Sequence, residues 1–160
     1  MQTRKNLRLE NYDYTQAGAY FVTVCTNGKK NILGSVVGGD AHIAPHTRLS
    51  PIGQVVEKYL LSIPGMDSYV IMPNHVHIIL LVSSTDMLQG PMWASAPTGK
   101  RVGSLVRSWK TLVSKELGKS IWQRSYYDHI IRNEKDYIRI AQYIEDNPSR
   151  WREDTYYCES

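Results

Sequence analysis

The stretch Ser68–Val82, SYVIMPNHVHIILLV, decides how this chain folds. Its second half, residues 75–82, follows a proline turn and is short and rich in branched apolar residues, which predicts a buried β-strand. Because side chains alternate across a strand, His75 and His77 share one face. Two imidazoles on one rigid element are suited to hold a divalent cation. A pair of ordinary strand histidines with satisfied hydrogen bonds is the competing interpretation.

Length and composition favour one soluble domain. The 160 residues suffice to bury a core, and we expect a single domain over residues 1–160. Hydrophobic residues make up 42% and charged residues 21%, which is ordinary for a globular protein. There is no run of 18 apolar residues and no apolar signal segment near the start, so we expect a cytoplasmic protein without a membrane span. Two cysteines, Cys25 and Cys158, are too few for a disulfide framework.

Positive charge is spread unevenly along the chain. The net charge is +4, and residues 100–139 hold ten Lys and Arg against four Asp and Glu. The first ten residues add Arg4, Lys5 and Arg8 against Glu10. Clustered positive charge favours a polyanionic partner, although a solvated basic helix face explains it equally well. The eleven Tyr and four Trp are suited to stacking on unpaired bases.

The first part of the chain alternates strand and helix signals. Polar residues 1–17 are predicted to form a basic arm, and residues 19–26, rich in β-branched and aromatic side chains, to form the first strand. Residues 32–37 predict a short second strand, and residues 38–50 a loop. A Ser-Pro pair then opens a predicted helix over residues 50–60, which carries an apolar stripe of helical period.

The part that follows the histidine strand is predicted to begin with a loop and continue through two helices. Residues 83–99 have no periodicity and predict a mobile loop. A helix is expected over residues 102–117, followed by a strand or extended segment over residues 122–132. A third helix runs from Glu134 to about residue 147 and is ended by a proline. The remaining residues, 148–160, are predicted to be a short tail.

The third helix separates two of its tyrosines. On a helical wheel Tyr137 falls on the apolar stripe with Ile140 and Ile144, whereas Tyr143 and Asn147 fall on a polar stripe. A tyrosine on a polar stripe is available for chemistry or hydrogen bonding. A surface tyrosine without a function is the competing interpretation, because the chain contains eleven tyrosines.

The histidine pair, the polar-face tyrosine and the basic surface together suggest phosphodiester cleavage by covalent catalysis. A cation held by His75 and His77 would polarise the phosphate, and Tyr143 would attack phosphorus to form a phosphotyrosine link. A phenol has an ordinary pKa of about 10, so Tyr143 would need help from the cation or a base.

Two blocks of sequence carry a resemblance to a known family. The first is MPNHVH at residues 72–77, in which a hydrophobic residue separates two histidines. The second is WQRSYYDHIIRNEKDYIRIAQYIEDNPSRW at residues 122–151, and the strand AYFVTVCT at residues 19–26 also fits. On these blocks the chain resembles the single-tyrosine HUH transposases, and among them the REP-associated tyrosine transposases. The resemblance extends from about residue 12 to 152.

The resemblance implies a fold, a cofactor and a reaction. The fold is a ferredoxin-like (RRM-like) α+β arrangement with the HUH strand central in an antiparallel sheet and helices packed on it. The cofactor is a divalent cation, Mg²⁺ or Mn²⁺. The reaction is cleavage of single-stranded DNA next to hairpins, which gives a 5′-phosphotyrosine and a free 3′-OH, by a monomer or a homodimer.

The resemblance also implies roles for individual residues. The Tyr-Ile-x-x-Asn-Pro segment places the nucleophile on Tyr143 rather than on the Tyr126-Tyr127 pair. Asn147, four residues later, would complete the metal site with His75 and His77. His129 resembles a recurrent family position that contacts phosphate. Together with it, the clustered positive charge predicts DNA contacts by Arg4, Lys5, Arg107, Lys110, Arg124 and Arg132.

Three other functions stay open on the sequence. A domesticated relative that binds single-stranded or hairpin nucleic acid without cutting it would have nearly the same sequence. An HUH nuclease that initiates replication or plasmid transfer is usually larger. A hydrolase that uses only a metal at His75 and His77 would need additional carboxylate ligands and would leave no covalent adduct.

Overall fold

The computed structural model describes residues 18–82 and 101–159. The predicted basic arm, residues 1–17, and the predicted mobile loop, residues 83–99, lie outside the described residues. None of the described helices is long and apolar enough to cross a membrane. In chain order the elements are β1 (Gly18–Cys25), η1 (Asn27–Lys29), β2 (Gly34–Val37), β3 (His46–Leu49), α1 (Pro51–Leu60), β4 (Met66–Ile71), β5 (His75–Val82), α2 (Arg101–Leu117), β6 (Tyr127–Ile131), α3 (Glu134–Asp146) and η2 (Pro148–Glu153).

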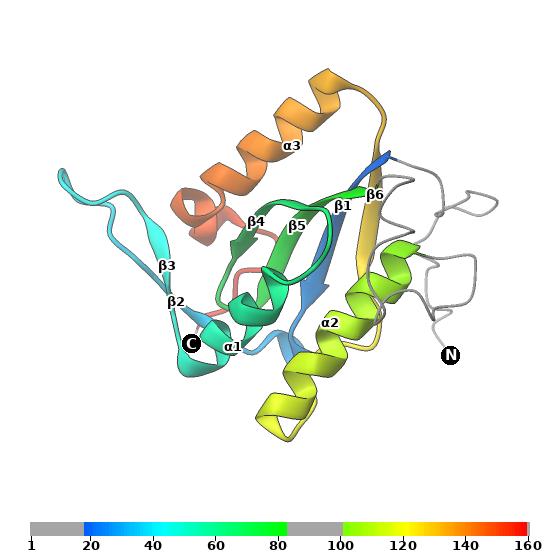
Figure 1. Cartoon of the computed structure of the whole chain (residues 1–160). Coiled ribbons are helices and arrows are strands. Elements are labelled where there is room, and N and C mark those ends of the chain that lie inside the picture. The colour runs from blue at the N-terminus through cyan, green and yellow to red at the C-terminus, as the bar shows by residue number, and fades with distance from the viewer. Residues whose placement is uncertain (1–17, 83–100, 160) are drawn as a thin grey trace, which may run out of the picture.

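A four-stranded antiparallel sheet in the order β4-β5-β1-β6 forms the centre of the fold (Figure 1). The histidine strand β5 is an inner strand, paired with β4 on one side and β1 on the other. In the β1–β5 register, Thr23 lies opposite His77 and Cys25 opposite His75. The predicted α+β fold with a central HUH strand is therefore confirmed.

Helices cover both faces of this sheet. Helices α1 and α2 pack on the face formed by alternate residues of the inner strands, such as Val22 and Ile78. Helix α3 covers the other face, where Phe21 and Ile79 meet its apolar stripe. The strand alternation that buries Ile78 against α2 therefore turns His75 and His77 toward the α3 side.

Helix α1 begins where the sequence predicts. The hydroxyl of Ser50 accepts a hydrogen bond from the Gly53 backbone N–H at 3.0 Å, and Pro51 occupies the first turn. Gly53 also lets the helix approach a neighbouring chain segment closely, because a Cβ there would lie 2.0 Å from the Leu33 carbonyl oxygen. This contact requires a glycine.

The predicted loop over residues 38–50 is partly wrong. Residues His46–Leu49 form β3, which pairs with β2 in a two-stranded hairpin that projects from the body of the protein (Figure 1). The sequence HTRL has no apolar run, and its side chains alternate only between exposed and half-buried positions. Backbone pairing with β2 creates this strand, and pairing leaves little trace in hydrophobic periodicity. Strand β2 is also shorter than predicted and begins at Gly34.

Trp109 on α2 is the largest fully buried side chain in the described residues. Its indole N–H donates to the Val56 carbonyl at 3.2 Å, and its ring lies 4.9 Å from that of Trp122. We expect Trp109→Ala to lower the free energy of unfolding by about 3–5 kcal/mol, because it leaves a cavity and removes the indole hydrogen bond. Urea unfolding followed by circular dichroism measures this, with exposed Lys115→Ala expected to stay within about 0.5 kcal/mol of wild type. Equal losses in both variants would contradict the prediction.

Candidate active site at the histidine pair

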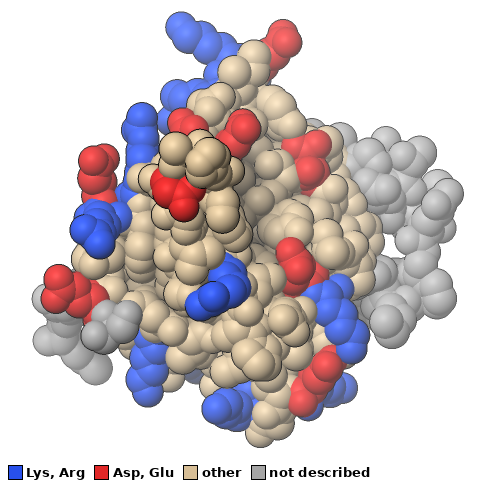
Figure 2. All heavy atoms as spheres, turned by 90° about the vertical axis from the view of Figure 1, so that its left-hand side faces the viewer, with Lys and Arg blue, Asp and Glu red and all other residues tan. Residues whose placement is uncertain are grey.

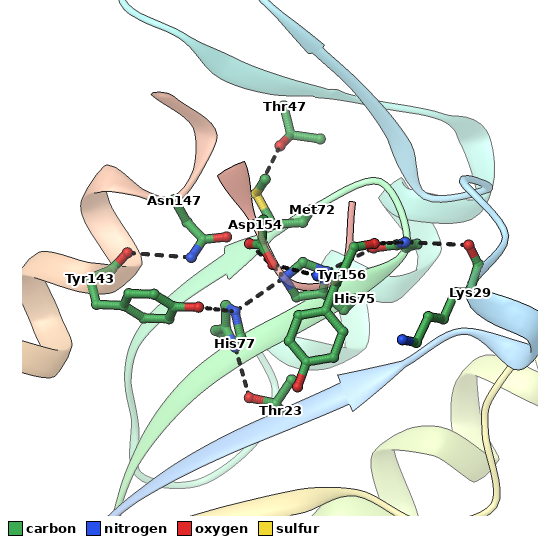
Figure 3. A network of polar contacts seen from close by, with 11 residues as sticks. Thr23, Lys29, Thr47, Met72, His75, His77, Tyr143, Asn147, Asp154 and Tyr156 are labelled. Carbon is green, nitrogen blue, oxygen red and sulfur yellow. Dashed lines mark hydrogen bonds and ion pairs between the residues drawn. The ribbon is translucent and has the colours of Figure 1, made fainter. Parts of the chain in front are cut away.

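His75 and His77 form the centre of a buried polar cluster (Figure 3). Their side chains are fully buried, and their Nε2 atoms lie 3.1 Å apart. The outer ring nitrogens have partners in the surrounding protein. His75 Nδ1 is 2.8 Å from the Asn74 side-chain oxygen, and His77 Nδ1 is 2.8 Å from the Thr23 hydroxyl. The two Nε2 atoms therefore face a common point, as two ligands of one ion would.

Burial keeps both imidazoles neutral at physiological pH. It lowers the pKa of His75 to about 3, with the Asn147 side chain opposing this shift and the positive charge of Lys29 adding to it. Burial and the neighbouring His75 hold the pKa of His77 well below its usual range. Neutral imidazoles have a nitrogen lone pair available for a metal ion, so both side chains are in the form that binds metal.

Helix α3 brings Tyr143 to this cluster. Asn133 caps the start of the helix, since its side chain accepts a hydrogen bond from the Asp136 backbone N–H at 2.8 Å. Its apolar stripe, with Ile140 and Ile144, packs on the sheet, so the adjacent polar stripe lies along the rim. The Tyr143 hydroxyl lies 3.5 Å from His77 Nε2, while the side chain stays 44% exposed.

The Tyr143 phenol is protonated in this environment. Burial raises its pKa above the ordinary value, the Asn147 side chain opposes the shift, and the negative charge of Asp154 adds to it. Tyr143 thus combines an accessible hydroxyl with a need for activation, as the sequence analysis predicts.

The C-terminal segment contributes two side chains that the sequence analysis missed. One oxygen of Asp154 lies 3.8 Å from His75 Nε2, and its other oxygen accepts a hydrogen bond from the Tyr156 backbone N–H at 2.8 Å. The Tyr156 ring lies against His75, with 4.6 Å between ring centroids. Residues 148–160 were predicted to be a simple tail. Trp151, Asp154 and Tyr156 of this segment instead pack against the site, by contacts that local periodicity does not encode.

The residues present fit a divalent cation. The ligand atoms of His75, His77 and Asp154 lie within 4.8 Å of one another. The side-chain oxygen of Asn147 is buried and has no hydrogen-bond partner among the described residues. In Figure 3 this amide lies beside Asp154 and the two imidazoles. Two imidazole nitrogens, one carboxylate and one orphaned amide oxygen can together replace part of the hydration shell of such an ion.

Comparisons with known proteins show what the chain is similar to. An uncharacterized protein of Haemophilus influenzae is 32% identical, and the match covers 98% of this chain and 94% of that protein. A second protein of H. influenzae, named "Putative REP-associated tyrosine transposase", is 25% identical over 88% of this chain and 76% of its own length. No family model matches the chain.

A solved structure agrees with the fold. It is that of a REP-associated tyrosine transposase bound to a REP hairpin, with a TM-score of 0.59 and 22% identity over 89% of this chain and 73% of that one. The chain is thus similar in sequence to a putative REP-associated tyrosine transposase and shares the fold of a solved one.

Four residues that the sequence analysis singled out come together in one place. His75 and His77 are adjacent, Tyr143 contacts His77, and Asn147 lies one turn beyond Tyr143. Asn147 is buried, with only 3% of its surface exposed, so it does not continue the exposed polar stripe of α3 but turns into the site.

The predicted DNA-contact residues are dispersed over the transposase-like fold. Arg107 and Lys110 lie on α2, which packs on the sheet face opposite the histidine pair. The Lys110 ammonium is half-buried and donates to the Gln123 carbonyl at 2.6 Å, and burial lowers its pKa. Arg124 and Arg132 are exposed near the two ends of β6. Arg4 and Lys5 lie outside the described residues.

His129 is on β6, on the α3 side of the sheet. It lies opposite Phe21, and its Nε2 is 2.9 Å from an Asp136 oxygen. The second Asp136 oxygen accepts from Arg139 at 2.6 Å. Asp136 and Arg139 stand on the same stripe of α3 as Tyr143, and His129 approaches them from the strand. A phosphate contact by His129 stays a prediction.

Charges of both signs are interspersed on the face that Figure 2 shows. Among the described residues of this face, Lys and Arg side chains do not gather into one continuous basic patch, because Asp and Glu side chains lie between them. The basic segment of the sequence, residues 100–139, includes α2 and the first part of α3. Because these two helices cover opposite faces of the sheet, the positive charge of the segment is divided between the two sides.

Proposed function

We propose that this protein is a metal-dependent single-stranded DNA transesterase that cuts next to DNA hairpins through a 5′-phosphotyrosine link on Tyr143. The observation that carries the proposal is the position of the Tyr143 hydroxyl, 3.5 Å from His77 Nε2 at the rim of the histidine–carboxylate cluster. A nucleophile next to a cation site is the arrangement that phosphodiester transesterification requires.

Each side chain of the cluster has a role in this proposal. His75, His77, Asp154 and Asn147 would hold a divalent cation, Mg²⁺ or Mn²⁺, which when bound polarises the scissile phosphate and lowers the pKa of the attacking phenol. Helix α3 fixes Tyr143 to the rim, because Ile140 and Ile144 pack on the sheet beneath it.

The proposed reaction exchanges one phosphoester for another. The Tyr143 oxygen attacks phosphorus and forms an O–P bond, and the bond from phosphorus to the 3′ oxygen of the preceding nucleotide breaks. The phenol proton is lost and the leaving 3′ oxygen gains one, which leaves a free 3′-OH and a 5′-phosphotyrosine. Attack of a 3′-OH on the phosphotyrosine reverses the step and transfers the strand, as in recombination.

The proposed substrate is single-stranded DNA at the foot of a hairpin. The support is the related transposase of similar fold that was solved bound to a REP hairpin. We expect this protein to act in the cytoplasm as a monomer or a homodimer.

A denaturing gel tests the proposed function directly. A labelled DNA hairpin with single-stranded flanks, incubated with Mn²⁺ or Mg²⁺, should give a slow-migrating covalent protein–DNA adduct. Removing the cation with EDTA should reduce the adduct at least about 100-fold, because the phenol and the phosphate both lose their activation. Binding of the hairpin without any adduct in either ion would contradict the enzyme and favour the non-catalytic binder. Cleavage without an adduct would favour a metal-only hydrolase.

A further inference from the structure

Asn74 lies between the histidine strand and the C-terminal segment, and its side chain is fully buried. The amide nitrogen donates to the Tyr156 carbonyl at 2.7 Å and to the Lys29 carbonyl at 3.3 Å. Because carbonyl oxygens only accept hydrogen bonds, these two contacts fix which end of the amide is the nitrogen. The amide oxygen must therefore face the other way, toward His75.

This orientation determines where the ring proton of His75 lies. The Asn74 oxygen is 2.8 Å from His75 Nδ1 and can only accept, so Nδ1 must carry the hydrogen. A neutral imidazole has one ring N–H, and Nε2 of His75 is therefore left with its lone pair. The ring already presents the nitrogen that a cation would use.

The same reasoning extends to His77 and Thr23. The two Nε2 atoms lie 3.1 Å apart, and since His75 Nε2 has no hydrogen, His77 Nε2 must donate one. His77 Nδ1 is then an acceptor, and the Thr23 hydroxyl donates to it at 2.8 Å. Without a cation the hydrogen bonds run in one direction, from Thr23 through both histidines to Asn74 and the Tyr156 carbonyl (Figure 3).

We propose that Asn74 and Thr23 are positioning residues that set the tautomers of the two histidines. Asn74 holds His75 permanently in the Nδ1–H form. Thr23 allows His77 to exchange its Nε2–H for an Nδ1–H when a cation binds, since a hydroxyl can turn from donor to acceptor. His77 releases the Nε2 proton to solvent and takes one up at Nδ1, so its charge does not change. The cation part of this inference rests on the proposed function.

Conservative variants separate positioning from a purely structural role. Asn74→Asp keeps the oxygen that accepts from His75 but loses both donated bonds, whereas Asn74→Leu loses all three. Thr23→Ser keeps the hydroxyl, and Thr23→Val removes it with little change in shape. If Asn74→Leu fails to fold, Asn74→Asp and the two Thr23 variants still test the inference.

The tautomers can be observed by ¹⁵N–¹H NMR of the imidazole rings, with and without Zn²⁺ as a diamagnetic probe. In the metal-free wild type we expect His75 as Nδ1–H and His77 as Nε2–H, with Zn²⁺ converting only His77. Asn74→Asp should keep His75 as Nδ1–H. Thr23→Val should weaken Zn²⁺ binding about 10–100-fold by calorimetry, and Thr23→Ser should stay within about threefold of wild type.

Two results would overturn the inference. One is a metal-free spectrum with the His75 proton on Nε2, and the other is equal Zn²⁺ affinity in Thr23→Ser and Thr23→Val. Neither measurement uses DNA, so a failure of the proposed cleavage reaction would not produce these results. Conversely, an active enzyme with the opposite tautomers would leave the proposed function standing.

Discussion

Replacing Tyr143 with phenylalanine is expected to abolish the covalent protein–DNA adduct and to lower the cleavage rate at least about 10³-fold, because it removes the only atom that attacks phosphorus in the proposed reaction. The ring should stay in place. It makes an edge contact with Phe21 at 6.1 Å between centroids, and this ring contact does not depend on the hydroxyl. Hairpin affinity and thermal stability should therefore remain close to those of wild type.

Two other tyrosines provide matched controls for this experiment. Tyr127 is exposed on β6, and Tyr156 covers His75 from the C-terminal segment. Burial raises the pKa of Tyr156 to about 12, so little of this phenol ionises to the phenolate that could attack phosphorus. Tyr127→Phe and Tyr156→Phe should both form the adduct. An adduct that persists in Tyr143→Phe and disappears in Tyr156→Phe would assign the nucleophile to the C-terminal segment, and mass spectrometry of the DNA-linked peptide would identify it.

Asp154→Asn is expected to weaken Mn²⁺ binding at least about 10-fold and to reduce adduct formation in parallel. The substitution removes the only carboxylate that the described residues bring to the cluster, and with it the only negative charge that would face the cation. The asparagine oxygen can still accept from the Tyr156 backbone N–H, so the C-terminal segment should keep its position. Calorimetric titration of Mn²⁺ into DNA-free protein measures the affinity.

The neighbouring Glu153 offers a control for nonspecific charge effects. Its side chain is exposed on η2, and Glu153→Gln removes the same charge one residue away from the site. We expect this variant to bind Mn²⁺ as wild type does. Equal weakening in both variants would show that the overall charge of the segment, rather than ligation by Asp154, controls the affinity. Unchanged affinity in both would exclude Asp154 as a ligand.

Most of the fold could be predicted because the signals are local. Residues 75–82 form a short run of branched apolar residues that is typical of a buried strand, and the Ser50-Pro51 pair marks a helix start that the structure reproduces. The wheel of α3 correctly separated Ile140 and Ile144, which face the sheet, from Tyr143, which does not. Strand β3 was missed because pairing across a hairpin, rather than any periodicity of its own, makes it a strand.

The sequence by itself determined the side chains that stand on regular elements, namely His75 and His77 on one strand face and Tyr143 with Asn147 one helical turn apart. For side chains only a few residues apart on one element, the period of the strand or helix determines whether they point in the same direction. Only the tertiary structure decided that Asp154 and Tyr156 join them, since no period links residues that lie about 80 positions from the histidine strand. Only the structure, likewise, shows that Lys110 lies on the sheet face opposite the histidine pair. The apolar packing of α2 sets this position, and the charge of Lys110 does not.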